Sequence, residues 1–154
     1  FSGLLYDLKL LNRVSNKNDN ILLTEAGIRF SQLKNPVLDN FQTDPTQKLS
    51  EEEKHFLIDH IMNSVPVEDF AYRTVLKIIA DGADTPNEID AELKEIVTKE
   101  RQEDLSNSFL SSQRSGTISR MEDLGLVERI RDGVRISYKI TESGSAYISQ
   151  KIKN

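Results

Sequence analysis

The stretch SSQRSGTISRMEDLGLVERIRDGVRISYKI, residues 111–140, decides the fold expected for this chain. Ile118, Met121 and Leu124 recur every three residues, which places them on one face of a helix. Gly125 follows the last of them, and a glycine commonly ends a helix. The sequence therefore predicts a helix over the first half of the stretch and strands over the second.

The second half of the stretch predicts a β-hairpin. Asp132-Gly133 is a strong turn signal, because both central positions of a type I′ turn need a positive φ. After it, apolar and polar residues alternate with the period of a half-buried strand. The apolar set is Val134, Ile136, Tyr138 and Ile140, and the polar set is Arg135, Ser137 and Lys139.

This stretch resembles the recognition helix and wing of the winged helix-turn-helix superfamily. The resemblance is carried by TISR at 117–120, by LGLVER at 124–129, and by the strand that ends in ITESG at 140–144. It implies a mainly α fold with small β-hairpin wings, and a role in binding duplex DNA. The superfamily hosts several functions, so the resemblance identifies a fold better than an activity.

A weaker copy of the same pattern opens the chain. Residues 2–14 and 21–30 align with residues 118–130 and 138–147, at an offset of 116 before the hairpin turn and 117 after it. In both copies a Thr-Glu-x-Gly motif follows the second strand, and its threonine (Thr24 or Thr141) is expected to cap the next helix. One supersecondary unit is therefore predicted twice.

Three regions are expected. Residues 1–38 would be the C-terminal half of a first winged helix, so that the chain begins inside a third helix. Residues 39–64 would be a connector with a linker helix, since Ser50 and Glu53 have capping-box spacing. Residues 65–154 would be a second, complete winged helix.

Within this second region the sequence predicts several helices and one insertion. A helix after Pro66 should bury Phe70, Val75, Leu76, Ile78 and Ile79, and the next should begin at Thr85-Pro86. A charged insertion at 94–110 should precede a recognition helix that starts near Ser115.

Composition excludes several classes of protein. The chain has 154 residues and no cysteine, so disulfides and cysteine-ligated zinc are excluded. No apolar run approaches the roughly 20 residues of a membrane span. The expectation is a soluble, intracellular, cytoplasmic protein with no metal, no cofactor and no membrane partner.

The charge is segregated along the chain. The net charge is −5, but residues 1–38 carry five Lys/Arg against three Asp/Glu, and residues 105–154 carry eight against five. Residues 39–104 carry seven against seventeen. The local field, rather than the sum, decides whether DNA is attracted.

The predicted DNA contacts fall in two groups. The first surrounds the recognition helix: Gln113, Arg114, Ser115, Thr117, Ser119 and Arg120. Gln113 and Arg114 should lie at its N-terminal end, in the major groove, with Thr117 and Arg120 on its outer face. Arginine can pair with guanine, glutamine with adenine, and hydroxyls can hold phosphates.

The second group belongs to the wing: Arg129, Arg131, Arg135 and Lys139. Guanidinium groups on one hairpin suit phosphate or minor-groove contact. Glu128 and Asp132 reduce the positive field of these four cations. The alternative to DNA contact is that the charged residues form cross-strand ion pairs on an exposed hairpin.

The first copy lacks this chemistry. Phe1, Gly3 and Leu4 align with Thr117, Ser119 and Arg120, and its wing at 15–20 carries only Lys17 as a cation. An apolar outer face suggests packing against protein, either a partner or a second copy of the chain.

Two alternatives to a DNA-binding transcription regulator stay open. One is a protein-interaction module that does not bind DNA; the other is the recognition domain of a restriction or nicking endonuclease. No nucleophile, metal or phosphate-binding motif is present, so we expect no catalysis in this stretch of chain.

Overall fold

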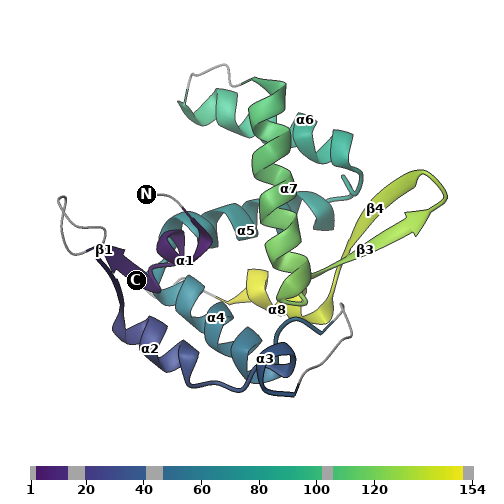
Figure 1. Cartoon of the computed structure of the whole chain (residues 1–154). Helices are drawn as coiled ribbons and strands as arrows, with labels where there is room; N and C mark the ends of the chain where they lie inside the picture. Colours follow the sequence, from purple (N-terminus) through teal and green to yellow (C-terminus); the bar gives the residue numbers. More distant parts are fainter. Residues whose placement is uncertain (1–2, 14–19, 41–46, 102–105, 151–154) are drawn as a thin grey trace. The chain divides into compact units, whose positions relative to one another are not determined.

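The computed structural model describes residues 3–13, 20–40, 47–101 and 106–150 (Figure 1). These residues are mainly helical with two small antiparallel hairpins, which confirms the predicted class of a mainly α protein with small hairpins. The chain divides into two compact units. The described residues up to Asp69 form one unit, and those from Phe70 to Gln150 form the other.

The described residues of the first unit form a short hairpin and four helices. Strands β1 (Leu11–Arg13) and β2 (Ile21–Leu23) pair antiparallel, with Leu11 opposite Leu23. The helices are α1 (Leu4–Asp7), α2 (Glu25–Ser31), α3 (Pro36–Asn40) and α4 (Glu51–Ser64). The core is small and aliphatic, formed by Leu8, Leu10, Leu57, Ile61 and Val65.

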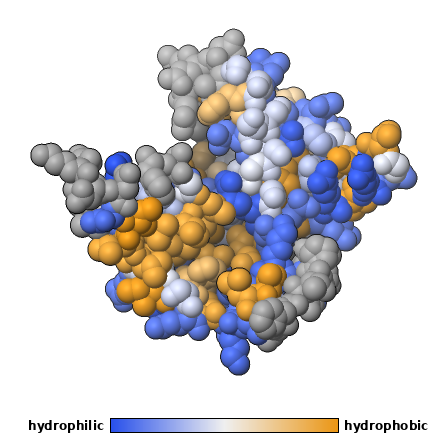
Figure 2. All heavy atoms as spheres, viewed as in Figure 1, coloured by the Kyte–Doolittle hydropathy of each residue, from blue (hydrophilic) through white to orange (hydrophobic). Residues whose placement is uncertain are grey.

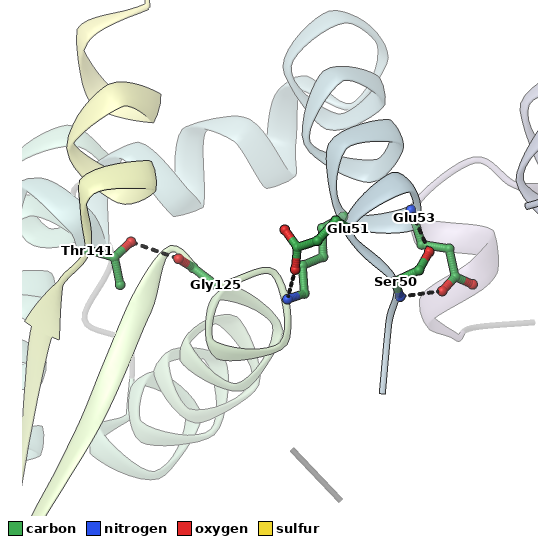
Figure 3. A network of polar contacts seen from close by, with 6 residues as sticks. Ser50, Glu51, Glu53, Gly125 and Thr141 are labelled. Carbon is green, nitrogen blue, oxygen red and sulfur yellow. Dashed lines mark hydrogen bonds and ion pairs between the residues drawn. The ribbon is translucent and has the colours of Figure 1, made fainter. Parts of the chain in front are cut away.

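Helix α4 begins where the sequence predicted. The Ser50 hydroxyl accepts from the Glu53 backbone N–H at 3.1 Å, and the Glu53 carboxylate accepts from the Ser50 N–H at 2.7 Å (Figure 3). This is the predicted capping box. Glu53 is only 4% exposed, and the Asn35 side-chain amide also donates to its oxygens at 3.0 Å, so the buried carboxylate has its partners.

The second unit contains three long helices, a hairpin and a short helix. Its elements are α5 (Pro66–Ala80), which starts at the boundary between the units, α6 (Pro86–Arg101), α7 (Asn107–Asp123), β3 (Val127–Asp132), β4 (Arg135–Ile140) and α8 (Glu142–Ser149). Strands β3 and β4 pair antiparallel.

Helix α5 contributes five residues to the core, but one residue predicted to be buried there is exposed. Tyr72, Val75, Leu76, Ile78 and Ile79 are buried, whereas Phe70 is 57% exposed. The prediction for Phe70 was wrong, because the buried stripe begins at Tyr72 and a residue two positions earlier points to another side of the helix.

Helix α7 is longer than predicted. It begins at Asn107, where the Ser106 hydroxyl accepts from the Phe109 N–H at 3.2 Å, and not near Ser115. Helix α6 extends to Arg101 and takes up much of the predicted insertion. Gln113 and Arg114 therefore lie in the middle of a helix, so their predicted place at its N-terminal end was wrong.

The hairpin turn also lies one residue later than predicted. Asp132 is paired opposite Arg135, which leaves Gly133 and Val134 as the central residues of the turn. Gly133 has a φ of 58°, and Val134 is not among the residues with positive φ. A type II′ turn needs a positive φ at its first central position only, so it fits better than the predicted type I′.

The backbone repeats at the start of each hairpin, as the alignment predicted. Lys9 and Gly125, 116 residues apart, both follow the end of a helix and both have a positive φ, 56° and 73°. The next residue's N–H then bonds back to the helix: Leu10 to the Leu5 carbonyl and Leu126 to the Met121 carbonyl, each at 2.9 Å.

The repeat continues at the end of each hairpin. The Thr24 hydroxyl donates to the Lys9 carbonyl at 2.8 Å, and the Thr141 hydroxyl donates to the Gly125 carbonyl at 2.7 Å (Figure 3). Each threonine oxygen also accepts from the N–H three residues later at 3.0 Å. The predicted threonine caps are therefore confirmed in both copies.

The helix after each hairpin packs on another helix through an aromatic pair, and that partner helix has a different place in the chain in each unit. Phe30 of α2 lies 5.7 Å from Phe56 of α4, centroid to centroid. At the equivalent position Tyr147 of α8 lies 6.1 Å from Tyr72 of α5. The supporting helix thus follows the hairpin in the first unit and precedes it in the second.

Candidate nucleic-acid interface

Helix α7 has one buried stripe, and it includes a residue predicted to face outward. Leu110, Thr117, Ile118 and Met121 are buried at helical spacing. Thr117 is only 5% exposed, so its predicted place on the outer face was wrong. It belongs to the turn that carries Ile118, and its hydroxyl accepts from Arg120 Nη2 at 3.5 Å.

Arg114 holds two helices together. Its Nε lies 2.7 Å from Oδ1 of Asp90 on α6, and the two side chains are 12% and 22% exposed. The other carboxylate oxygen of Asp90 accepts from the Ser111 hydroxyl at 2.6 Å. A guanidinium bound in this way serves the contact between α6 and α7.

The remaining recognition-helix candidates lie toward solvent. Gln113, Ser115 and Ser119 are exposed, and Arg120 is half-buried. Ser108 and Ser112, which the sequence reasoning missed, are exposed at spacings that continue the line of Ser115 and Ser119. One side of α7 therefore carries a line of small hydroxyls, and Gln113 and Phe109 are exposed on an adjoining side. The spacing of four, three and four residues was visible in the sequence.

The hairpin separates its charges between its two faces. Glu128 is paired opposite Lys139 and Asp132 opposite Arg135. Directly opposed residues share a face with Cβ atoms about 5 Å apart, so these acids offset these bases. On the other face Arg129 stands opposite Tyr138 and Arg131 opposite Ile136, with no acid between them.

The excess positive charge of the hairpin therefore comes from Arg129 and Arg131. Both are exposed, and neither has a hydrogen-bond or ion-pair partner in the part of the chain that the structure describes. Arg135 and Lys139 are also exposed but lie on the balanced face. The predicted four-cation wing thus divides into an uncompensated pair and a compensated pair.

The hairpin is tied to the helices at two points. The Tyr138 N–H donates to the Asp84 carbonyl, in the turn between α5 and α6, at 2.8 Å. At its base, the Leu126 N–H donates to the Met121 carbonyl of α7 at 2.9 Å. Figure 1 shows the hairpin extending from the C-terminal end of α7. These bonds hold the hairpin beside the helix.

His60 makes two contacts within the first unit. His60 Nε2 lies 2.8 Å from the Leu8 carbonyl oxygen and its ring stacks on Phe56, which gives it a structural role in the first unit. Within residues 3–13, 20–40, 47–101 and 106–150, no group of three or more His, Cys, Asp or Glu side chains could hold a metal ion. No helix in these ranges is long and apolar enough to cross a membrane.

Comparison with known proteins gives no relative: no family model, no curated protein and no solved structure matches this chain.

Proposed function

We propose that the second unit binds duplex DNA, with the outer face of α7 in the major groove and the Arg129–Arg131 face of the hairpin on the sugar–phosphate backbone. The role would be that of a transcription regulator or the DNA-targeting region of a larger protein. The order of three helices, a hairpin and a short helix supports the resemblance to winged helix-turn-helix proteins.

The observation that carries the proposal is the uncompensated arginine pair beside a polar helix face. Phosphate contacts supply most of the affinity for DNA, and two exposed guanidinium groups on one face can make them. The serines of α7 are short, so its backbone can approach base edges closely. Gln113 offers the amide that can pair with adenine.

The test compares two double variants that remove the same charge. Arg129→Ala/Arg131→Ala removes the uncompensated pair, and Arg135→Ala/Lys139→Ala removes the pair that faces acids. Binding to a random pool of duplexes is measured by fluorescence anisotropy at several salt concentrations. The slope of log Kobs against log salt changes by about 0.9 for each phosphate that the protein no longer neutralises.

We expect the slope to fall by about 2 in the first double variant and by much less in the second. Gln113→Ala should leave the slope unchanged and weaken the preference for one selected sequence. Absence of binding at low salt would refute the proposal, and so would equal slopes in the two double variants.

A second candidate is protein binding by the first unit. Leu5 aligns with Met121, yet Leu5 is 49% exposed and Met121 is fully buried. Other large apolar side chains of the unit are similarly exposed, including Leu22 at 57% and Leu38 at 77%. Figure 2 shows apolar side chains gathered over this unit. Exposed apolar area of this kind marks interaction sites.

Sedimentation of the chain over a range of concentrations tests this candidate for the case of self-association. A concentration-dependent mass that Leu22→Ser/Leu38→Ser abolishes would support it. A monomer at every concentration would exclude a second copy as the partner.

A further inference from the structure

An open groove lies between α5 and α6 of the second unit. Its volume is about 720 Å³, in the range of sites that hold a ligand or one face of a peptide. The turn between the two helices contributes Gly82 and Ala83 to its lining. Gly82 has a φ of 110°, a conformation that favours glycine, and this small turn leaves the hollow unfilled.

Apolar side chains from both helices line part of the groove. Phe70, Thr74 and Ile78 line it from α5 at intervals of four residues, and Ala91 and Ile96 line it from α6. Phe70 is 57% exposed, although a phenylalanine gains most from burial. Phe70 does not belong to the core, and its exposed ring is therefore available in the groove for contact with a partner.

The rim of the groove is acidic. Asp81, Glu88 and Glu92 line it with one cation, Lys77, and all four side chains are exposed. Glu88 accepts from the Thr85 hydroxyl at 2.7 Å and from the Thr85 N–H at 3.1 Å. These bonds hold the pKa of Glu88 below its usual value, so the carboxylate stays charged. The rim would repel phosphates and attract basic side chains.

We propose that this groove binds an amphipathic helix with basic flanks, the apolar side of which packs on the exposed Phe70 and Ala91. Helices commonly bind grooves of this kind through apolar side chains at i, i+3 or i+4, and i+7. Lysines or arginines beside that stripe would meet Asp81, Glu88 and Glu92. The partner is thus a protein segment, and its site is separate from the surface proposed for DNA.

The probe is a synthetic helical peptide with leucines at i, i+3, i+4 and i+7 and lysines on both flanks. A control peptide replaces every lysine by glutamate. Binding of each labelled peptide to the whole chain is measured by fluorescence anisotropy, without DNA. We expect the basic peptide to bind at least tenfold more tightly than the acidic one, and the difference to shrink as salt rises.

Two pairs of variants locate the site. Phe70→Ser should weaken binding of the basic peptide at least tenfold, whereas Phe109→Ser, an exposed phenylalanine of α7 outside the groove, should not. Glu92→Gln should weaken it, whereas Glu142→Gln on α8 should not. Circular dichroism checks that each variant is folded, and Ala91→Trp, which fills the groove, gives a second way to block the site.

Each outcome decides the proposal. Equal binding of the basic and acidic peptides, no binding of the basic one, or equal effects of Phe70→Ser and Phe109→Ser would overturn it. Anisotropy with duplex DNA is run on the same samples. Phe70→Ser should keep the DNA affinity of the parent, so failure of the groove and failure of the DNA proposal give different results.

Discussion

Arg114 and Asp90 join α7 to α6 through an ion pair of 2.7 Å between Nε and Oδ1. The two side chains are mostly buried, and Ser111 completes the partners of the carboxylate. A pair in this position contributes to the fold whether or not DNA is bound.

The first prediction is that Arg114→Ala destabilises the second unit. Removal of a fully buried partner costs about 3–5 kcal/mol and removal of an exposed one about 0–1, so we expect a decrease of about 2 kcal/mol in the free energy of unfolding. Urea unfolding followed by circular dichroism measures it. Lys99→Ala breaks the exposed pair with Glu95 and should leave stability unchanged. Equal effects of the two substitutions would contradict the structural role of Arg114.

The second prediction concerns a glycine that touches a carbonyl. A Cβ on Gly144 would lie 2.2 Å from the Leu126 oxygen, far inside van der Waals contact. Gly144→Ala should therefore lower the free energy of unfolding by about 3 kcal/mol, measured by urea unfolding.

The matched control for Gly144 is Gly116 in α7. A Cβ there would meet only the end of the Arg120 side chain, at 3.2 Å. Gly116→Ala should stabilise the helix by about 0.5–1 kcal/mol, because alanine loses less entropy than glycine on folding. Similar decreases in stability in both variants would show that the close approach to the carbonyl is not the cause.

The third prediction rests on the equivalence of Lys9 and Gly125. Both have a left-handed backbone, which costs a residue with a Cβ about 1–2 kcal/mol. Gly125→Ala should lower the free energy of unfolding by about 1 kcal/mol. Lys9→Gly should raise it by less, because the substitution also removes the bond from Lys9 Nζ to the Ser64 carbonyl. Thermal unfolding gives both values, and opposite signs would be the supporting result.

The fourth prediction concerns pH. Hydrogen bonds from Thr85 keep the pKa of Glu88 below 4.5, so the folded state favours the charged carboxylate. This contribution to stability is present above that pH and is lost as pH falls through the folded pKa. Thr85→Val removes the hydroxyl, and the Glu88 pKa measured by NMR titration should then rise toward 4.5.

The control for this titration is Thr98→Val, an exposed threonine on the same helix. It should leave the Glu88 titration as in the parent. The stability difference between the parent and Thr85→Val should be largest above pH 4.5 and vanish in acid. A difference that is independent of pH would assign the effect to packing instead.

The sequence predicted those features that are set by near neighbours. Each threonine cap joins a hydroxyl to the N–H three residues later. The capping box likewise joins Ser50 to Glu53, so both features depend on a few adjacent positions. The repeat was visible for the same reason, because its bonds recur within one short motif.

The errors arose where distant residues decide. The ion pair of Arg114 could not be predicted, because its partner, Asp90, lies on another helix 24 residues earlier. Thr117 lies only one residue, about 100°, before Ile118 and is buried with it, and the width of the buried stripe depends on what packs against the helix. The charge balance of the hairpin needed its pairing register, and a shift of one residue in the turn decides which arginines face an acid.

The two hairpins differ in length at only one place. Arg13 pairs with Ile21 and Arg129 pairs with Tyr138, so equivalent pairs enclose seven residues in one copy and eight in the other. The threonine and glycine contacts at the base are the same in both. The contacts at the base of the hairpin do not depend on the length of the loop at its tip. For protein engineering, we therefore expect the tip to accept loops of different length and charge while the rest of the domain keeps its fold.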